Sequence, residues 1–454
     1  MMSKKPIVIL GGGSTGLAAA YRLSQLGKKS IIIEKEKFLG GLSVTLKKDD
    51  FFYEFGPHAF HLKDEKITAW IKKLIGEANF RVIPTDTQVL IDHQFLTYPL
   101  KADELLKKIN PVLGAHILFS YLWARLKNFF VPKIPQNFED WGLASFGQVL
   151  YKISFGDYTA KVWGMSPKKI SSTMASQKLA KLNLGDIILK LLGFRGRLQP
   201  AYFKTFLYPK EGMGLIFEKM VREIKKNTQI ILEAKIHRLQ VEKGRVELIE
   251  YFDQAGQKKV LPCQGVISTI TLKDLVPMFN MPLGKEIIQA AKRLLYRDMV
   301  IIYLIVKAEN LSGSQWIYLV ENQFFFNRVT LAQNLSPDFG PKGKTAMSFE
   351  VCCQAGDELW QKDQKAWEKL VRKELKNLGW SKLKIEDLWV EKISNAYPIF
   401  PVGFERDLKI VLKGIEKVEN LISTGRNGLF LNSDIHDCFK MGFESAEKVL
   451  ERNG

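Results

Sequence analysis

Short apolar runs and amphipathic stretches alternate near both ends of the chain. Residues 6–10 form a β-branched apolar run bounded by glycine, which is typical of a strand buried on both faces. Apolar positions at helical spacing follow over 14–26, Gly27 ends that helix, and 30–33 is the next strand. Toward the other end, 420–424 reads as a buried strand and 435–452 as a helix. The pattern predicts an α/β fold of Rossmann type in which both ends build one domain.

The middle of the chain has two different patterns. Residues 62–204 are mostly helical in pattern, with strand signals only at 88–92 and 95–98. Further on, the pattern predicts strands at 229–232, 236–242, 246–252, 260–268, 299–307, 315–320, 324–329 and 345–352, then a helix at 362–378. We therefore expect three parts: a dinucleotide-binding domain from 1–61, 205–275 and 405–454, a mainly helical insertion from 62–204, and a mixed-sheet substrate domain from 276–404.

Composition adds a preference for anionic partners. The 454 residues are 46% apolar, and 67 basic against 48 acidic residues give a net charge of +19. This charge favours phosphates, nucleotides, nucleic acid or a lipid surface, and it equally serves solubility. Since no basic-aromatic motif accompanies it, we expect no nucleic-acid partner. The charge is therefore consistent with a small anionic substrate.

Cysteine usage and the N-terminal sequence indicate the compartment. None of the four cysteines has the spacing of a metal site, and Cys352-Cys353 is expected to lie buried in a strand. This usage favours a reducing compartment. The first predicted strand begins too near the N-terminus for a signal peptide to precede it. We expect a cytoplasmic protein.

One apolar segment leaves two interpretations open. In residues 112–131 the apolar run extends only from Val112 to Trp123, and basic and aromatic residues follow it. This run is shorter than the ~18 residues of a membrane span. A buried helix hairpin is one interpretation. The other is a helix that lies on a membrane surface, which would make the protein peripheral to the inner face of the membrane.

The most specific motif is a glycine-rich loop after the first predicted strand. Gly11, Gly13 and Gly16 form G-x-G-x-x-G, with Ser14 and Thr15 opening the helix. These glycines allow a tight turn, close approach of a pyrophosphate and close packing of helix on strand. Glu34 ends the second strand 21 residues after Gly13, where a carboxylate accepts hydrogen bonds from a ribose hydroxyl. This context predicts a dinucleotide site.

Two further segments favour FAD over NAD as that dinucleotide. Gly40-Gly41 lies just beyond Glu34, where close backbone approach would suit the diphosphate. Gly425-Arg426 precedes the last helix and supplies a second helix start for the flavin end. No Ser/His/Asp arrangement, metal cluster or phosphate-binding Walker loop is present, so the cofactor must carry the chemistry.

Together, these and other segments resemble the UDP-galactopyranose mutase-like branch of the FAD-dependent amine oxidase and protoporphyrinogen oxidase superfamily. The similar elements, in the same order, are Phe55-Gly56-Pro57-His58-Ala59-Phe60-His61, Asp157-Tyr158-Thr159-Ala160-Lys161-Val162-Trp163-Gly164, Phe326-Asn327-Arg328 and Ala396-Tyr397-Pro398. The chain departs from the amine oxidases in framing Gly40-Gly41 with Leu39 and Leu42, and from the mutases in having only lysines at 178–183, where a loop arginine is expected. The departures leave the identity of the sugar nucleotide open and indicate a relative of the galactopyranose mutases rather than a true member.

The resemblance implies an activity and a set of site residues. The activity is isomerisation of the ring of a nucleotide-activated sugar through a flavin N5–sugar adduct, with an external electron donor that reduces the flavin. The implied catalytic residues are His58, Arg328 and Tyr397. The implied FAD-binding residues are Gly11, Gly13, Ser14, Thr15, Gly16, Glu34, Lys35, Gly40, Gly41, Leu42, His58, Ile236, Gly425, Arg426, Asp434 and Ile435. The implied substrate-binding residues are Tyr158, Thr159, Trp163, Tyr208, Arg328 and Tyr397, with Tyr158 stacking on the base.

Other interpretations remain open on the same residues. A redox enzyme of this superfamily, an oxidase or desaturase, could collect a lipophilic substrate through 112–131, and a non-catalytic flavoprotein is a third reading. Arg328 needs a buried partner, which is either a phosphate or an acidic side chain. Tyr158 and Trp163 are either pocket walls or ordinary core, and His58 either contacts the flavin or is a structural histidine.

Overall fold

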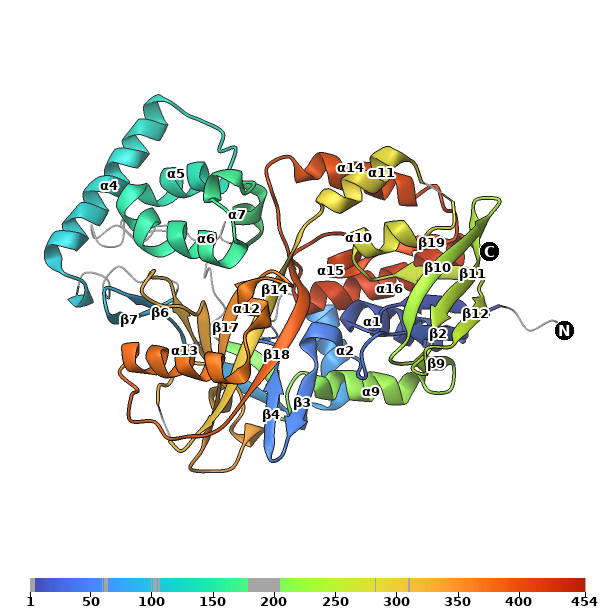
Figure 1. The fold of residues 1–454 in the computed structure, drawn as a ribbon, viewed down its shortest axis with the longest axis horizontal. Helices are drawn as coiled ribbons and strands as arrows, with labels where there is room; N and C mark the ends of the chain where they lie inside the picture. The colour runs from blue at the N-terminus through green and yellow to red at the C-terminus, as the bar shows by residue number, and fades with distance from the viewer. Residues whose placement is uncertain are drawn as a thin grey trace.

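The fold is described from a computed structural model. It describes residues 5–58, 60, 64–98, 100, 104, 107–178, 205–281, 283–308 and 311–453. Figure 1 shows three regions: a sheet domain that carries both termini, a lobe of helices at the opposite end, and a second sheet between and below them.

Both ends of the chain contribute to one parallel five-stranded sheet, in the order β19-β13-β1-β2-β9. Its strands are β1 (Ile7–Leu10), β2 (Ser30–Ile33), β9 (Thr228–Ile231), β13 (Gly265–Ser268) and β19 (Leu421–Ser423). All neighbours in this sheet run parallel, and Ile7–Leu10 pairs with β13 on one side and β2 on the other. The predicted α/β, Rossmann-type fold is confirmed.

Side-chain alternation along β1 buries both faces of this sheet. Ile7 and Ile9 pack in a core with the helices α1 (Ser14–Gln25), α2 (Glu65–Ile75), α9 (Gly214–Ile224) and α16 (Ile435–Glu451). Val8 and Leu10 pack on the other side, against the antiparallel sheet β10 (Lys235–Glu242), β11 (Arg245–Phe252) and β12 (Lys258–Pro262) and the helices α10 (Leu272–Leu275), α11 (Lys285–Arg293) and α14 (Phe404–Ile415). A strand without a polar position therefore lies at the centre of three layers.

A seven-stranded, mainly antiparallel sheet forms the second region, in the order β18-β14-β17-β16-β15-β6-β7. Its strands are β6 (Thr87–Ile91), β7 (Gln94–Thr97), β14 (Tyr296–Val306), β15 (Trp316–Leu319), β16 (Arg328–Leu331), β17 (Thr345–Cys353) and β18 (Ile385–Pro398). Helix α13 (Gln364–Asn377) covers one face, where Trp367 is fully buried. Strands β6 and β7 join this sheet although they lie within the stretch expected to be a helical insertion.

The lobe of helices contains α4 (Pro111–Phe130), α5 (Phe138–Tyr151), α6 (Asp157–Trp163) and the short α7 (Thr173–Lys178). A π-helical turn at Lys152–Gly156 joins α5 to α6. Asparagine side chains cap α4 and α5: Asn110 accepts from the amide of Val112, and Asn137 accepts from the amide of Asp140. Helix α4 lies at the outer edge of the lobe (Figure 1).

Several predicted strands differ in the structure. The run 260–268 is broken at residues 263–264, and its halves, β12 and β13, belong to different sheets. The aromatic residues 324–326 precede β16 in an irregular turn, so Arg328 begins its strand instead of ending one. Sequence patterns also missed β18 and the pairs β3 (Thr45–Lys48) with β4 (Phe51–Glu54) and β5 (Phe80–Pro84) with β8 (Thr205–Pro209).

Two composition-based expectations can be compared with the structure. All four cysteines are free and buried, and Cys352 and Cys353 lie in β17 as predicted. Within the described residues, no helix combines the length and the apolar character that crossing a bilayer requires.

The contact between the first and last long helices is close enough to test. A Cβ placed on Gly442 of α16 would lie 2.5 Å from the Cβ of Ala18 and 2.5 Å from the carbonyl oxygen of Thr15 on α1. We predict that Gly442→Val lowers the free energy of unfolding by about 2–4 kcal/mol, because both helices would have to move apart. Glu444→Val, at an exposed position of the same helix, should change it by less than about 0.5 kcal/mol. Denaturant unfolding measures both, and equal effects of the two substitutions would contradict the close contact.

Candidate active site

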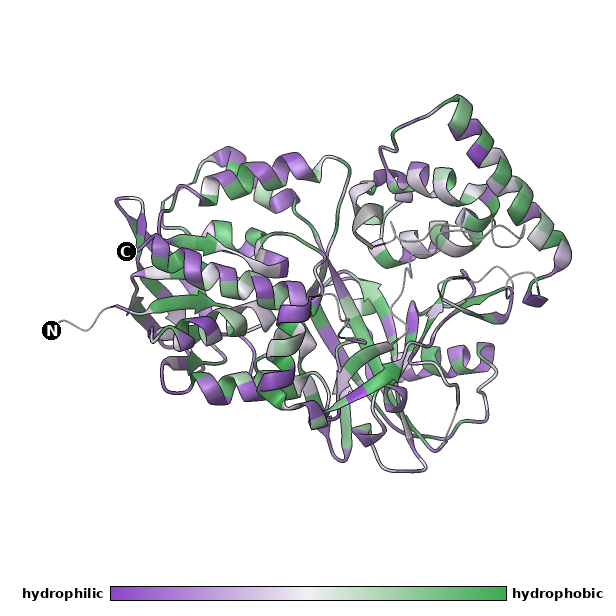
Figure 2. Cartoon of the chain, turned by 180° about the vertical axis from the view of Figure 1, so that it is seen from behind, coloured by the Kyte–Doolittle hydropathy of each residue, from purple (hydrophilic) through white to green (hydrophobic). Residues whose placement is uncertain are grey.

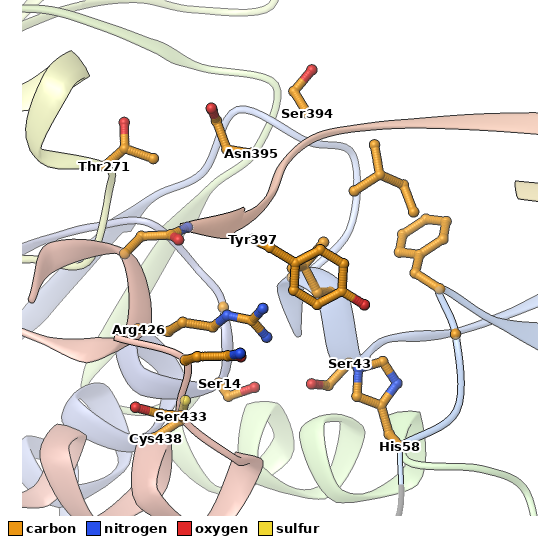
Figure 3. A pocket seen from close by; sticks show the side chains of 18 of the residues that line it. Ser14, Ser43, His58, Thr271, Ser394, Asn395, Tyr397, Arg426, Ser433 and Cys438 are labelled. Atoms are coloured by element: carbon orange, nitrogen blue, oxygen red, sulfur yellow. The ribbon is translucent and has the colours of Figure 1, made fainter. Parts of the chain in front are cut away.

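One large cavity lies where the regions of the molecule meet. It has a volume of about 1230 Å³, and its walls come from the glycine loop, the seven-stranded sheet, the helical lobe and the start of α16. Figure 3 shows Tyr397 and Arg426, from the C-terminal part of the chain, facing the same space as Ser14, Ser43 and His58. The cavity therefore gathers residues that are hundreds of positions apart in the sequence.

The N-terminus of α1 opens into this cavity without a side-chain cap. Gly13 is its N-cap residue, no side chain caps it, and its first turn has no acidic residue. Ser14 and Thr15 line the cavity, so the free amide groups and the positive end of the helix dipole face it. Gly16 allows this arrangement, because a Cβ there would clash with the carbonyl oxygen of Gly11. The geometry suits a pyrophosphate.

Glu34 lies beside the loop and is buried. One carboxylate oxygen accepts a hydrogen bond from the amide of Gly12 at 2.6 Å, and the other accepts from the amide of Glu36 at 2.9 Å. Burial raises the pKa of Glu34, while these two amides lower it. A carboxylate offers about four acceptor positions, so two remain for ribose hydroxyls. The side chain is therefore fixed in place before any ligand binds.

The double glycine packs directly against the glycine loop. The amide of Gly40 donates to the carbonyl oxygen of Gly12 at 2.9 Å, and Gly40 forms a β-bridge with Gly13. Both Gly40 and Gly41 have positive φ angles, which favours glycine there. Leu42, Lys35 and Ile236 complete this side of the cavity. The second segment predicted to contact the cofactor thus lies beside the first.

The C-terminal wall carries buried polar atoms that have no hydrogen-bond partner in the part of the chain that the structure describes. Arg426 donates from Nη2 to the carbonyl oxygen of Ala396 at 2.8 Å, but its Nε has no partner. The Oδ1 atoms of Asn427 and Asn432 also have none, and all three residues line the cavity together with Asp434 and Ile435 at the start of α16. Buried polar groups are almost always paired in native proteins. Their state here indicates that a polar ligand completes the site.

His58 faces the cavity from the turn after β4. Its Nδ1 lies 3.7 Å from Oε2 of Glu54, and both atoms lack a hydrogen-bond partner among the described residues. The other oxygen of Glu54 is held by the hydroxyl of Thr45 at 2.6 Å and by the amide of Met213 at 2.8 Å. Glu54 is thus rigid and placed to orient His58 when a ligand aligns the imidazole ring.

Arg328 has an acidic partner in the structure. Its Nε and Nη2 donate to the two carboxylate oxygens of Glu350 at 2.9 and 2.5 Å, and Glu350 is buried. The pair follows from the sheet, because β16 and β17 place Arg328 opposite Glu350 in the ladder. Two of the five guanidinium hydrogens are used, so three can still reach a ligand. Arg328 can therefore donate hydrogen bonds to a ligand, while the carboxylate of Glu350 compensates most of its positive charge.

Tyr397 lies between two other predicted site residues. The guanidinium of Arg426 stands 5.1 Å from the centre of its ring, and Trp163 meets the ring edge-on at 6.1 Å. Burial raises the pKa of the Tyr397 hydroxyl, although Arg328 opposes that shift. The hydroxyl therefore stays protonated at neutral pH and can donate a proton or a hydrogen bond into the cavity.

The helical lobe supplies an aromatic wall opposite the glycine loop. Tyr158 meets Tyr318 edge-on at 6.2 Å, Tyr98 meets Tyr318 at 5.5 Å, and Thr159 and Trp163 also line the cavity. Lys161 fixes this wall to the sheet, since its Nζ donates to the carbonyl oxygens of Leu319, Phe324 and Phe326 at 2.8–3.1 Å. Burial lowers the pKa of Lys161 to about 8. Apolar side chains of β6, at Val89 and Ile91, continue the wall.

One predicted substrate residue lies elsewhere. Tyr208 is fully buried in β8, packs against Phe206 and Phe339, and does not line the cavity. Burial raises the pKa of its hydroxyl, which lies next to the carboxylate of Glu54. The prediction is wrong because β8 pairs with β5 behind the cavity. His61 and the lysines beyond residue 178 lie outside the described residues.

The remaining predictions fall on the cavity or just behind it. Gly16 and Gly425 do not line the cavity but pack against its walls, and the other predicted site residues line it. Sequence patterns missed Glu54, Glu350, Tyr318 and Asn427. Only the position of Asn427, directly after Gly425-Arg426, offered a signal in the sequence.

Comparison with known proteins agrees with this geometry. Residues 14–450 match the family of flavin containing amine oxidoreductases. The chain is 24% identical over 198 residues to a probable UDP-galactopyranose mutase of Klebsiella pneumoniae. The aligned residues cover 41% of this chain and 48% of that protein. It is 24% identical over 244 residues to a dTDP-fucopyranose mutase of Escherichia coli, covering 52% and 58%. The matched stretches span about half the length of these two mutases.

Two further likenesses bear on the fold and the family. Over 134 residues the chain is 31% identical to a 4,4'-diapophytoene desaturase of Staphylococcus aureus, covering 28% of this chain and 26% of that protein. The solved structure of a reduced UDP-galactopyranose mutase superposes with a TM-score of 0.83 at 21% identity, covering 99% of this chain and 96% of that one. The resemblance found in the sequence is thereby confirmed. The chain belongs to the family of flavin-containing amine oxidoreductases, and it is an enzyme with FAD as its cofactor.

Proposed function

We propose that this enzyme isomerises a nucleotide-activated sugar. The observation that carries the proposal is that His58, Tyr158, Arg328 and Tyr397 line the same cavity as the glycine loop. These residues come from segments that resemble mutase elements and that lie far apart in the sequence. Whole-chain similarity to the fold of a reduced UDP-galactopyranose mutase supports the proposal.

The residues around the glycine loop fit FAD. The uncapped start of α1 would hold the diphosphate, Glu34 the ribose, and the unpaired polar atoms of Arg426, Asn427 and Asn432 the flavin end. When bound and reduced by an external electron donor, FAD supplies an electron-rich centre to the substrate carbon. Isomerisation leaves the composition of the substrate unchanged, so electrons from that donor are not consumed.

The protein side chains would bind and orient the substrate. The aromatic wall of Tyr158 and Tyr318 suits the flat face of a base, and stacking of this kind contributes about 1–3 kcal/mol. Hydrogen bonds from Arg328 and from the Tyr397 hydroxyl would hold the diphosphate as it leaves the sugar and returns. His58, oriented by Glu54, would fix the sugar end near the flavin. Burial of the cavity between two sheets and the helical lobe would limit the access of water.

A specific observation favours a second candidate, a redox enzyme acting on a lipophilic substrate. The charge of Arg328 is compensated by Glu350, and the wall beyond Tyr158 is formed by Val89, Ile91, Leu100 and Val320. Such a wall would suit a substrate with a long apolar part. The similarity to a desaturase over 134 residues is in line with this alternative. Either activity would fit our expectation of a cytoplasmic enzyme, which we retain as a proposal.

The two candidates differ in what they do with electrons. We predict that uridine or thymidine diphosphate sugars raise the melting temperature of the holoenzyme, and that ring isomerisation occurs only after dithionite reduces the flavin. Thermal-shift assays and chromatography of the products under argon measure both effects. Oxygen consumption with a lipophilic substrate, without any shift from nucleotide sugars, would instead identify the redox enzyme.

The FAD site can be tested at Glu34. Glu34→Ala leaves the buried amide of Gly12 without its acceptor, a loss that costs about 1–3 kcal/mol, and it also frees the amide of Glu36. We predict that the variant binds FAD at least about tenfold more weakly, measured by titration of the apoprotein and by the ratio of flavin to protein absorbance. Glu444→Ala, at an exposed position of α16 that does not line the cavity, is the control and should retain FAD. Similar losses in both variants would argue against the role of Glu34.

The Tyr397 hydroxyl can be tested without changing the packing of its ring. Tyr397→Phe keeps the contacts with Arg426 and Trp163, so FAD content should be unchanged while kcat falls by about 10–100-fold. Because burial raises the pKa of Tyr397, the wild-type rate should show no loss from its ionisation between pH 7 and about 10. Tyr251→Phe, on β11 and outside the cavity wall, is the control. An unchanged kcat in Tyr397→Phe would remove this hydroxyl from the mechanism.

A further inference from the structure

An exposed apolar surface covers the outer side of α4 and the turn after it. We call it the α4 face, and its large apolar side chains are Val112, Leu118, Phe119, Leu122, Trp123, Leu126, Phe129, Phe130, Val131 and Ile134. Exposure reaches 72% for Phe119, 80% for Phe129 and 85% for Ile134. Single exposed apolar residues are common on any protein, but a contiguous set of this kind marks an interaction surface.

The α4 face lies directly opposite the side of the helix that packs on the protein. With about 100° between successive residues, the buried residues Gly114, Ile117 and Tyr121 share one side, and the exposed apolar residues centre on the other. Figure 2 shows apolar positions along this outermost helix of the lobe. The helix thus has two apolar sides. One packs against the rest of the protein, and the other is exposed.

Contacts with α5 prevent the exposed side from turning inward. The amide of Val149 donates to the hydroxyl of Ser120 at 3.1 Å, and the side-chain amide of Asn128 donates to the carbonyl oxygen of Ala144 at 3.1 Å. A Cβ on Gly147 would lie 2.7 Å from the backbone of Ser120, so the two helices meet at backbone distance. The exposure of the α4 face is therefore fixed by the packing of the lobe.

The charged side chains of α4 and the turn after it are all of one sign. Residues 111–137 contain no aspartate or glutamate, and Arg125, Lys127 and Lys133 are exposed there. Helical spacing puts Arg125 on one flank of the apolar side and Lys127 on the other. Long basic side chains on both flanks of an apolar helix side can reach anionic headgroups while their stems stay apolar.

Charge also decides between a lipid surface and a second copy of this chain. Two α4 faces packed on each other in a symmetric dimer would bring the same basic residues together, and neither face has an acidic residue to pair with them. A surface of anionic lipids instead complements these charges and accepts Trp123 and the phenylalanines at headgroup depth. The α4 face therefore requires a partner with a negatively charged surface and an apolar interior.

We propose that the α4 face docks this enzyme on membranes that contain anionic phospholipids. The helix would lie in the plane of the interface, with a length of about 30 Å for its 20 residues. Its inner side reaches the cavity wall, because Leu113 packs in the same cluster as Val89, Ile91 and Tyr98, which line the cavity. Docking therefore places the apolar end of the cavity one helix diameter from the lipid.

Sedimentation with vesicles tests this proposal on the FAD-loaded enzyme. The wild type should bind vesicles of phosphatidylcholine mixed with phosphatidylglycerol, bind pure phosphatidylcholine more weakly, and lose binding as salt screens the basic flanks. Phe119→Glu combined with Phe130→Glu should weaken binding by at least about tenfold. Val260→Glu is the control, because it also replaces an exposed apolar residue by glutamate, at a 53% exposed position on β12. It should bind vesicles like the wild type.

Two further measurements separate the outcomes. Brominated lipids should quench Trp123, and Trp123→Phe should lose that quenching while melting temperature and FAD content stay unchanged. Vesicle binding that survives the double substitution, or that is equal for neutral and anionic vesicles, would overturn the proposal. So would a wild type that ignores vesicles and forms a dimer in sedimentation velocity that the double substitution dissociates, since the occupant would then be a second copy.

Discussion

Burial of β1 on both faces is the constraint on which the rest of this structure depends. Ile7 and Ile9 need apolar cover on one side, and Val8 and Leu10 need it on the other. Helices from both ends of the chain provide the first cover, and the β10–β12 sheet provides the second. Because both faces of the sheet are covered, the loop after β1 emerges at the carboxyl ends of the strands, where the free amides of α1 are directed outward. The position of the glycine loop at the cavity is thus a consequence of the packing on both faces of the four-residue strand β1.

The cavity is electrostatically uneven, and this helps to explain how one fold can serve different chemistry. Near the glycine loop, helix starts and unpaired polar atoms favour an anionic ligand. Toward the helical lobe, Arg328 is neutralised by Glu350 and the walls become aromatic and aliphatic. The first half suits the cofactor that the whole family shares. The second half is where related enzymes can differ, by exchanging side chains on a wall that has little charge of its own.

The sequence was most informative where local pattern and local chemistry coincide. The glycine loop, Glu34 and the long helices were predictable because each depends on residues within about 30 positions. The long strand β18 was not, since its charged and apolar residues do not alternate regularly and it is defined by its pairing with β14, almost 90 positions earlier. For the same reason the partner of Arg328 remained open, because only the register of β16 and β17 places Glu350 opposite it. Tyr208 was misassigned because its strand pairs with β5, which the pattern did not show.

The position of β19 and α16 has a consequence for synthesis of the protein. About 390 residues separate the end of β2 from the start of β19, which closes the same sheet. A ribosome adds about 5–20 residues per second, so the sheet that β1 and β2 begin waits roughly 20–80 s for its last strand. During this time the apolar side of α1 that α16 later covers is without its partner, and the cavity wall with Arg426, Asn427 and Asn432 does not exist. The cavity can therefore be complete only at the end of translation, and the nascent chain depends on other means to keep that surface from aggregating.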